Sequence, residues 1–160
     1  PVLSFTAEEI WQGNNFLLEE ADSVFLTTLK DLEDFESDLS KEDWKRLLDI
    51  KEEVNQSIEE SRADGVIKGS LDASIELMLN SNDFKLLDKL ALEMHFFFIV
   101  SECKISEGET LKISITKSSA EKCVRCWHRN KSVGSSKKHP DLCNRCEQNL
   151  DGQGEDRRFA

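Results

Sequence analysis

The stretch that decides the fold is a pair of cysteine turns near the C-terminus. It reads Cys123-Val124-Arg125-Cys126, then sixteen residues, then Cys143-Asn144-Arg145-Cys146. Two residues between cysteines allow a tight turn that directs both sulfurs to one point, and this C-x2-C-x16-C-x2-C spacing is typical of zinc sites. Four thiolates occupy the four tetrahedral positions, about 2.3 Å from the metal, and leave no position for water. The motif therefore predicts one structural, non-catalytic Zn²⁺.

The segment around the motif needs such a metal in order to fold. About forty residues with few large apolar side chains do not form a stable core alone. Zinc binding on the order of 10–16 kcal/mol can supply that stability. Four thiolates and one Zn²⁺ carry a local charge of −2, which nearby cations can offset. These cations are Lys122, Arg125, Arg129 and Arg145.

Three alternatives to a four-cysteine zinc site remain open but are less favoured. A rubredoxin-like iron site uses similar spacing, although redox carriers are usually dedicated small folds. A redox dithiol needs a helix-start setting that the flanking residues lack. His128 or His139 could replace one cysteine, but four well-spaced cysteines make this unnecessary.

Charge is divided unevenly along the chain. Residues 1–118 carry 12 Lys/Arg and 26 Asp/Glu, whereas residues 119–160 carry 9 Lys/Arg and 6 Asp/Glu, within an overall net charge of −11. The C-terminal segment is thus the basic part of an acidic protein, and a polyanion would approach there.

The remaining features favour a reducing compartment. No apolar run is long enough to span a membrane, and the first residues lack the basic and apolar regions of a signal peptide. Cys103 stands alone, so a disulfide framework is not indicated, and we expect it to be a buried small residue. Because the first residue is Pro1 rather than Met, we expect a piece of a longer chain.

The first part of the chain predicts two helices. Thr6 and Glu9 have the spacing of a capping box, Phe5 and Ile10 that of a hydrophobic staple, and Gly13 ends a short helix. Residues 16–39 read as an acidic loop with one helical turn. A longer amphipathic helix then begins at the cap Ser40, with Asp43 in its first turn, and runs to Arg62. Its apolar positions are Trp44, Leu47, Leu48, Val54 and Ile58.

The next part predicts a small sheet with a second helix. Gly65 and Gly69 break the long helix. Apolar and polar residues alternate over 71–79 and 110–116, which predicts two strands. Ser81 or Asn82 caps a helix between them. The apolar run 94–100 fits the end of that helix or the start of a strand, and His95 within it is expected to be a packed or surface residue.

Trp127 follows the second cysteine directly, and two interpretations are open. Its ring could cover the metal site. Alternatively it could stack on an unpaired base while Arg125 and Arg129 contact phosphate or a base edge.

These residues also resemble a known family. The cysteine turns with Trp127 and His128, the segment His139-Pro140-Asp141-Leu142, and the ending Gly154-Glu155-Asp156-Arg157-Arg158-Phe159-Ala160 are similar to the C-terminal zinc module of bacterial-type isoleucyl-tRNA synthetases. Leu3-Ser4-Phe5-Thr6-Ala7-Glu8-Glu9-Ile10-Trp11 resembles a helix start in the anticodon-binding domain of related synthetases. Arg62-Ala63-Asp64 and Gly69-Ser70-Leu71-Asp72-Ala73 also fit.

The resemblance implies an α+β chain of three parts. Residues 1–63 would be the end of a helical anticodon-binding bundle, 64–118 a small α/β junction and 119–160 the zinc module. The full enzyme activates isoleucine with ATP and transfers it to its tRNA. This chain lacks the two ATP-site signatures of the family, His-Ile-Gly-His and Lys-Met-Ser-Lys-Ser. It would therefore contain no catalytic residue, and ATP would bind only in the missing catalytic domain.

The implied partners are an isoleucine-specific tRNA and the remainder of the synthetase chain. The RNA-binding candidates are Arg125 and Trp127, followed by His128 and Arg129. We expect a cytoplasmic monomer with no membrane contact, or alternatively a protein of an organelle matrix. A different class of function also fits the acidic composition: an adaptor whose zinc ribbon binds a protein partner.

Overall fold

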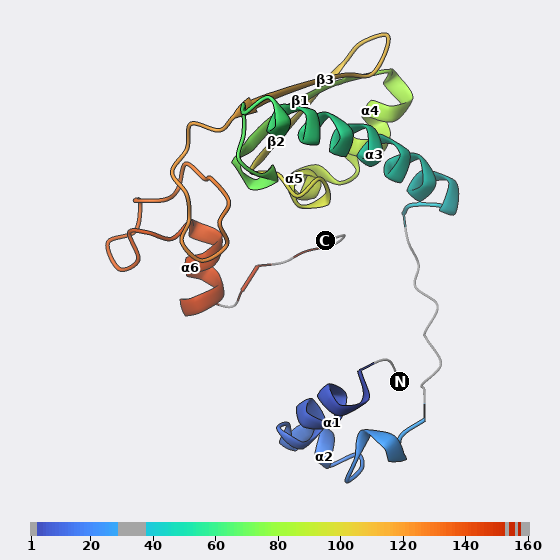
Figure 1. Ribbon diagram of the computed structural model, residues 1–160, viewed down its shortest axis with the longest axis vertical. Coiled ribbons are helices and arrows are strands. Elements are labelled where there is room, and N and C mark those ends of the chain that lie inside the picture. The colour runs from blue at the N-terminus through green and yellow to red at the C-terminus, as the bar shows by residue number, and fades with distance from the viewer. Residues whose placement is uncertain (1–2, 29–37, 153, 156, 158–160) are drawn as a thin grey trace. The chain divides into compact units, whose positions relative to one another are not determined.

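The computed structural model describes residues 3–28, 38–152, 154–155 and 157. It divides into two compact units, residues 1–38 and residues 39–160. The elements along the chain are α1 (Ser4–Gln12), α2 (Asn15–Leu18), η1 (Val24–Leu26), α3 (Lys41–Ala63), η2 (Ser70–Asp72), β1 (Ala73–Leu79), α4 (Ser81–Asp88), η3 (Ala91–Glu93), α5 (Met94–Phe97), β2 (Glu102–Glu107), β3 (Lys112–Lys117) and α6 (Asn144–Asp151). They are shown in Figure 1, with η denoting a 3-10 helix. Among the described helices, none combines the length and apolar character needed to cross a membrane.

The first unit is a short helical segment held by its own polar contacts. The Glu8 carboxylate of α1 accepts hydrogen bonds from the Ser23 hydroxyl (2.8 Å) and the Val24 amide (3.1 Å). The Trp11 indole donates to the Ala21 carbonyl at 2.7 Å. These bonds fold η1 back onto α1, and none of residues 3–28 is buried, so local pairing orders this segment.

The predicted cap of this helix is wrong. Helix α1 begins at Ser4 with Leu3 at the N-cap and has no side-chain cap bond. Thr6 therefore lies inside the first turn, where its hydroxyl cannot cap the helix. Phe5 and Ile10 are exposed, at 87% and 62%, so the predicted staple is not formed. The predicted end of the helix at Gly13 is confirmed.

The N-cap and most of the buried face of helix α3 match the sequence prediction. Ser40 caps the helix, as predicted, and Asp43 in its first turn completes a capping box that was not predicted. The buried face of the helix consists of Leu47, Ile50, Val54 and Ile58. Trp44 is half-buried against this core, but Leu48 is exposed, so the apolar face is narrower than the pattern indicated.

The sheet has the strand order β2-β1-β3. Strand β1 pairs in parallel with β2 and antiparallel with β3. Alternate side chains of β1 are buried, because helices α3 and α4 pack on one face of the sheet. These residues are Ala73, Ile75, Leu77 and Leu79. The two predicted strands are confirmed, with shifted ends, whereas β2 was not predicted.

The region between β1 and β2 shows which residue caps α4 and what the apolar run 94–100 forms. Helix α4 is capped by Asn80, not by Ser81 or Asn82, since the Asn80 side chain accepts from both the Asn82 and Asp83 amides at 3.0 Å. The apolar run 94–100 forms the short helix α5 and then a turn through Ile99, whose φ is 55°. Val100 then leads into β2.

The domain limits at 63/64 and 118/119 remain predictions. The packing places α3 with the sheet, since its buried residues belong to the same core as those of β1. The four-cysteine segment forms a second, smaller buried cluster of its own.

Candidate metal centre and nucleic-acid interface

Four cysteines converge in the C-terminal segment. Cys123 and Cys126 lie on a turn in which the Trp127 amide donates to the Cys123 carbonyl at 2.9 Å. Cys143 is the N-cap of α6, and Cys146 lies in the first turn of this helix. Their Sγ atoms all lie within 4.8 Å of one another, and those of Cys126 and Cys143 are 3.7 Å apart. Tetrahedral zinc with sulfur at about 2.3 Å requires sulfurs about 3.8 Å apart, so the donor set fits one Zn²⁺.

The surroundings act differently on the four sulfurs. Burial acts to raise the pKa of Cys123, but the Cys126 and Cys143 amides that point at its sulfur prevail and lower the pKa to about 6. Burial raises the pKa of Cys143 to about 12, so a cation is needed to hold all four sulfurs as thiolates. The Arg125 guanidinium lies 3.7 Å from the Cys146 sulfur and offsets part of the charge.

The other candidate ligands lie outside the cluster. His139 bonds to Asp151 at 2.9 Å, and His128 places Nδ1 3.2 Å from the Cys126 carbonyl oxygen. Cys103 lies on β2, where burial raises its pKa to about 12 and keeps it a thiol. Among the described residues, the four tail cysteines form the single group of three or more potential ligands close enough to share an ion.

The Trp127 side chain is exposed to solvent rather than buried. It is 60% exposed and adopts a left-handed φ of 67°. Its ring does not belong to the buried cysteine cluster, and the Lys122 ammonium lies 4.9 Å from the ring centroid. The ring lines an open cavity of about 440 Å³ beside η2. This placement favours a role as a contact surface over a role as a lid on the metal.

Arg129 has a structural task that the sequence did not reveal. Its Nε donates to the Asp72 carboxylate at 2.7 Å, and its Nη1 donates to the Ala120 carbonyl at 3.1 Å. Its amide donates to the Ser101 hydroxyl at 2.6 Å. Arg129 therefore attaches the zinc module to the start of β1. Because Asp72 lies 57 residues away in sequence, no local sequence pattern indicates this pairing.

A second unpredicted cluster surrounds Phe96. The guanidinium carbons of Arg145 and Arg157 lie 4.8 and 4.0 Å from the Phe96 ring centroid. Both guanidinium groups also bond to the Glu155 carboxylate, at 3.2 and 2.9 Å. The His128 ring meets the Phe96 ring edge-on at a centroid distance of 5.7 Å. This cluster ties helix α5, helix α6 and the C-terminal segment together.

The Nε2 atom of His128 is buried. Within the described residues, this atom has no hydrogen-bond partner, and burial lowers the pKa of the ring. His128 thus packs between the metal turn and Phe96 as a neutral ring at pH 7.

Two family models and several known proteins match this chain. A family model described as a zinc finger found in FPG and IleRS matches residues 120–149, and one described as an anticodon-binding domain of tRNA ligase matches residues 1–77. An isoleucine–tRNA ligase of Dichelobacter nodosus is 43% identical over the whole chain, and those of Shewanella halifaxensis and Idiomarina loihiensis are 41% and 38% identical.

Over its whole length the chain is similar to isoleucine–tRNA ligases, and it carries matches to an anticodon-binding model and a zinc-finger model. It covers 17–18% of the length of these ligases. The zinc-finger match contains all four clustered cysteines, so the predicted structural zinc site is confirmed. That these four cysteines are its ligands remains a prediction, which their convergence supports. The predicted fold class is confirmed as well, because helices, a small mixed sheet and the cysteine module are all present.

Proposed function

We propose that this chain is the non-catalytic tRNA-recognition region of an isoleucine–tRNA ligase. The observation that carries the proposal is the whole-length similarity to such ligases, together with an anticodon-binding match over residues 1–77 and a zinc-finger match over residues 120–149. The complete enzyme would attach isoleucine to its tRNA using ATP bound in a separate catalytic domain. Its partners would be that tRNA and the rest of the ligase chain, in a cytoplasmic monomer.

The zinc module would supply the RNA contact. The exposed indole of Trp127 offers a flat surface on which an unpaired base can stack. Arg125, two residues before Trp127 in sequence, is exposed and can reach phosphate in addition to its contact with the Cys146 sulfur. His128 and Arg129 are weaker candidates, because packing and the Asp72 ion pair already engage them. Their part in the proposed function is to hold the turn that carries Trp127.

A Trp127→Ala variant tests this proposal. Loss of one stacked base is worth about 1–3 kcal/mol, so affinity for isoleucine tRNA should fall by about tenfold or more in a filter-binding titration. Leu150→Ala, which shortens another exposed apolar side chain of the same module, is the matched control and should leave affinity unchanged. Unchanged affinity in a Trp127→Ala protein that still binds one zinc per chain would exclude the stacking role.

The adaptor hypothesis predicts a different outcome. RNA binding through phosphate contacts weakens steeply with salt, whereas a protein-binding ribbon would show no RNA binding even at low salt. The similarity to tRNA ligases disfavours the adaptor.

A further inference from the structure

Each cysteine turn carries an arginine that contacts a sulfur of the other turn. The Arg125 side chain, from the first turn, donates to the Cys146 sulfur at 3.7 Å. Arg145 comes from the second turn. Burial acts to lower the pKa of Arg145, but its hydrogen bond to the Cys126 sulfur prevails and raises it. The second cysteine of each turn therefore has its charge offset by an arginine of the opposite turn.

The first cysteine of each turn is stabilised by backbone amides instead. The Cys143 amide donates to the Cys123 sulfur at 3.4 Å, and the Cys146 amide donates to the Cys143 sulfur. Cys123 and Cys143 are both buried. A reagent in solution can therefore reach neither sulfur unless the fold opens locally.

Cys126 differs from the other three cysteines in its exposure. Cys146 is buried in the first turn of α6, whereas Cys126 is only half-buried. The side chain bonded to the Cys126 sulfur, that of Arg145, is itself held in place. It donates to the Glu155 carboxylate at 3.2 Å, its guanidinium carbon lies 4.8 Å from the Phe96 ring centroid, and it is only 23% exposed. Arg145 is thus a fixed cation beside the most accessible of the four sulfurs.

A cation in this position lowers the reactivity of the sulfur. A metal ligand is already a thiolate, so an added cation cannot increase the fraction of thiolate. It draws electron density from the sulfur, and the nucleophilicity of a thiolate falls as its basicity falls. Removal of the Arg145 guanidinium should therefore make Cys126 react faster.

We propose that Cys126 is the site at which a soft carbon electrophile modifies the zinc module, and that Arg145 slows this reaction. The Cys126 sulfur adds to an activated carbon–carbon double bond. A carbon–sulfur bond forms, the π bond breaks, and water supplies the proton that the neighbouring carbon takes up. The product is a neutral thioether without the thiolate charge that binds the metal, so the module loses its zinc. This inference rests on the predicted four-cysteine ligand set and is independent of RNA binding.

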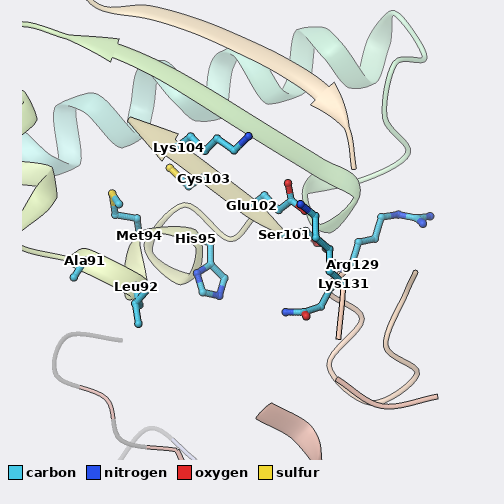
Figure 2. Close-up of a pocket in the computed structure, with 11 residues that line it drawn as sticks. Ala91, Leu92, Met94, His95, Ser101, Glu102, Cys103, Lys104, Arg129 and Lys131 are labelled. Atoms are coloured by element: carbon cyan, nitrogen blue, oxygen red, sulfur yellow. Dashed lines mark hydrogen bonds between the residues drawn. The ribbon is translucent and has the colours of Figure 1, made fainter. Parts of the chain in front are cut away.

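Cys103 provides an internal reference for this reaction. It lies on β2 and lines an open cleft of about 470 Å³ (Figure 2). Burial raises the pKa of its thiol to about 12, so very little of the reactive thiolate is present at pH 7. Cys103 should therefore react more slowly than Cys126, and its modification should release no zinc.

A limiting amount of N-ethylmaleimide, added to the reduced, zinc-loaded protein, tests the site. Mass spectrometry of the singly labelled chains should find the label on Cys126. A chromophoric chelator should detect one zinc released for each Cys126 modified, and none in a sample without the reagent. A first label on any other cysteine, or zinc that stays bound after Cys126 is labelled, would overturn the proposal.

Arg145→Gln tests the part played by the arginine, in protein shown to contain one zinc. A cation in contact changes the basicity of a thiolate by a factor of about ten to a hundred, and nucleophilicity follows basicity with an exponent of about 0.4–0.5. Zinc release by N-ethylmaleimide should therefore become about three- to tenfold faster. Arg145→Lys, which keeps the charge, should give a rate between those of Arg145→Gln and wild type.

Arg157→Gln is the matched control. Arg157 also contacts Phe96 and bonds to Glu155, but among the described contacts it touches no cysteine sulfur. Its removal should leave the rate of zinc release at the wild-type value. Equal rates for Arg145→Gln and Arg157→Gln would refute the role of Arg145. The proposed RNA binding would stand in that case, because Trp127→Ala tests it separately.

Discussion

At the scale of single residues, the Asp72–Arg129 pair is the most consequential contact outside the metal site. The two side chains are only 17% and 21% exposed, and their atoms are 2.7 Å apart. The Arg129 hydrogen bond lowers the pKa of Asp72, although burial acts to raise it. By contrast, Glu76 and Lys104 are 64% and 68% exposed and 3.7 Å apart, so solvent screens their attraction.

Asp72→Asn should lower the free energy of unfolding by about 1–3 kcal/mol at pH 7, because it weakens a charge-assisted hydrogen bond. The folded-state pKa of Asp72 is depressed, so its contribution is present above the unfolded value of about 3.9 and is lost as pH falls through the folded value. The difference between wild type and variant should therefore be constant from about pH 5 to 8 and shrink below about pH 4.

Urea unfolding at several pH values measures this difference. Glu76→Gln is the control, and its effect should stay below about 1 kcal/mol. An Asp72→Asn effect that equals the control, or that grows as pH falls, would contradict the assigned role of the pair.

At the scale of elements, the start of helix α4 depends on one side chain. Asn80 accepts two amide hydrogen bonds through Oδ1, and its Nδ2 donates to the Asp83 carboxylate at 2.8 Å. That carboxylate also receives two bonds from Arg46, which lower the pKa of Asp83 against the opposing effect of burial. The cap thus joins α4 to α3.

Asn80→Ala should cost about 1–2 kcal/mol of stability through the lost cap. Ser81→Ala should be close to neutral, since Ser81 is the first helical residue and is exposed. Thermal unfolding of the two variants compares them directly. Equal losses, or a larger loss for Ser81→Ala, would mean that the cap was assigned to the wrong residue.

Helix α5 is attached to the zinc module through Phe96. Its ring contacts two guanidinium groups, and an exposed cation–π contact contributes about 0.5–1 kcal/mol. Phe96→Ala should therefore increase hydrogen exchange in α6 and in the Glu155 region, without loss of zinc. Phe25→Ala, at a side chain 63% exposed in the first unit, should leave this exchange unchanged. Unaltered exchange in Phe96→Ala would show that the cluster does not hold the module.

These elements also show where prediction from sequence succeeds. The cap at Ser40 and the buried alternation of β1 follow from local spacing, and both are confirmed. The four-cysteine ligand set also follows from spacing and remains a prediction, which the convergence of the four sulfurs supports. Strand β2 was missed because Cys103 and Ile105 are too few to show an alternating pattern, whereas Leu111 extends the alternation of β3 to three apolar residues. The Arg129 and Phe96 contacts were missed because their partners are distant in sequence. The RNA contacts of Arg125 and Trp127 remain predictions.

At the scale of the whole molecule, the second unit contains two parts that are stabilised in different ways, one by an apolar core and one by the metal site. Among the described residues, the sheet and α3 share an apolar core of fifteen buried residues, whereas the cysteine module buries little more than its four cysteines and Leu142. The sheet should therefore be stable without metal, and the module should not. The metal therefore holds the turn on which Trp127 is exposed, so the proposed RNA binding should depend on it.

Hydrogen exchange measured before and after zinc removal by a chelator tests this account most directly. The reduced protein should contain one zinc per chain, and removing it should abolish amide protection across residues 120–149 while β1 retains its own. Affinity for tRNA should fall with the zinc content. Protection of residues 120–149 that persists in fully zinc-free protein would contradict the claim that the four thiolates and their ion give this module its shape.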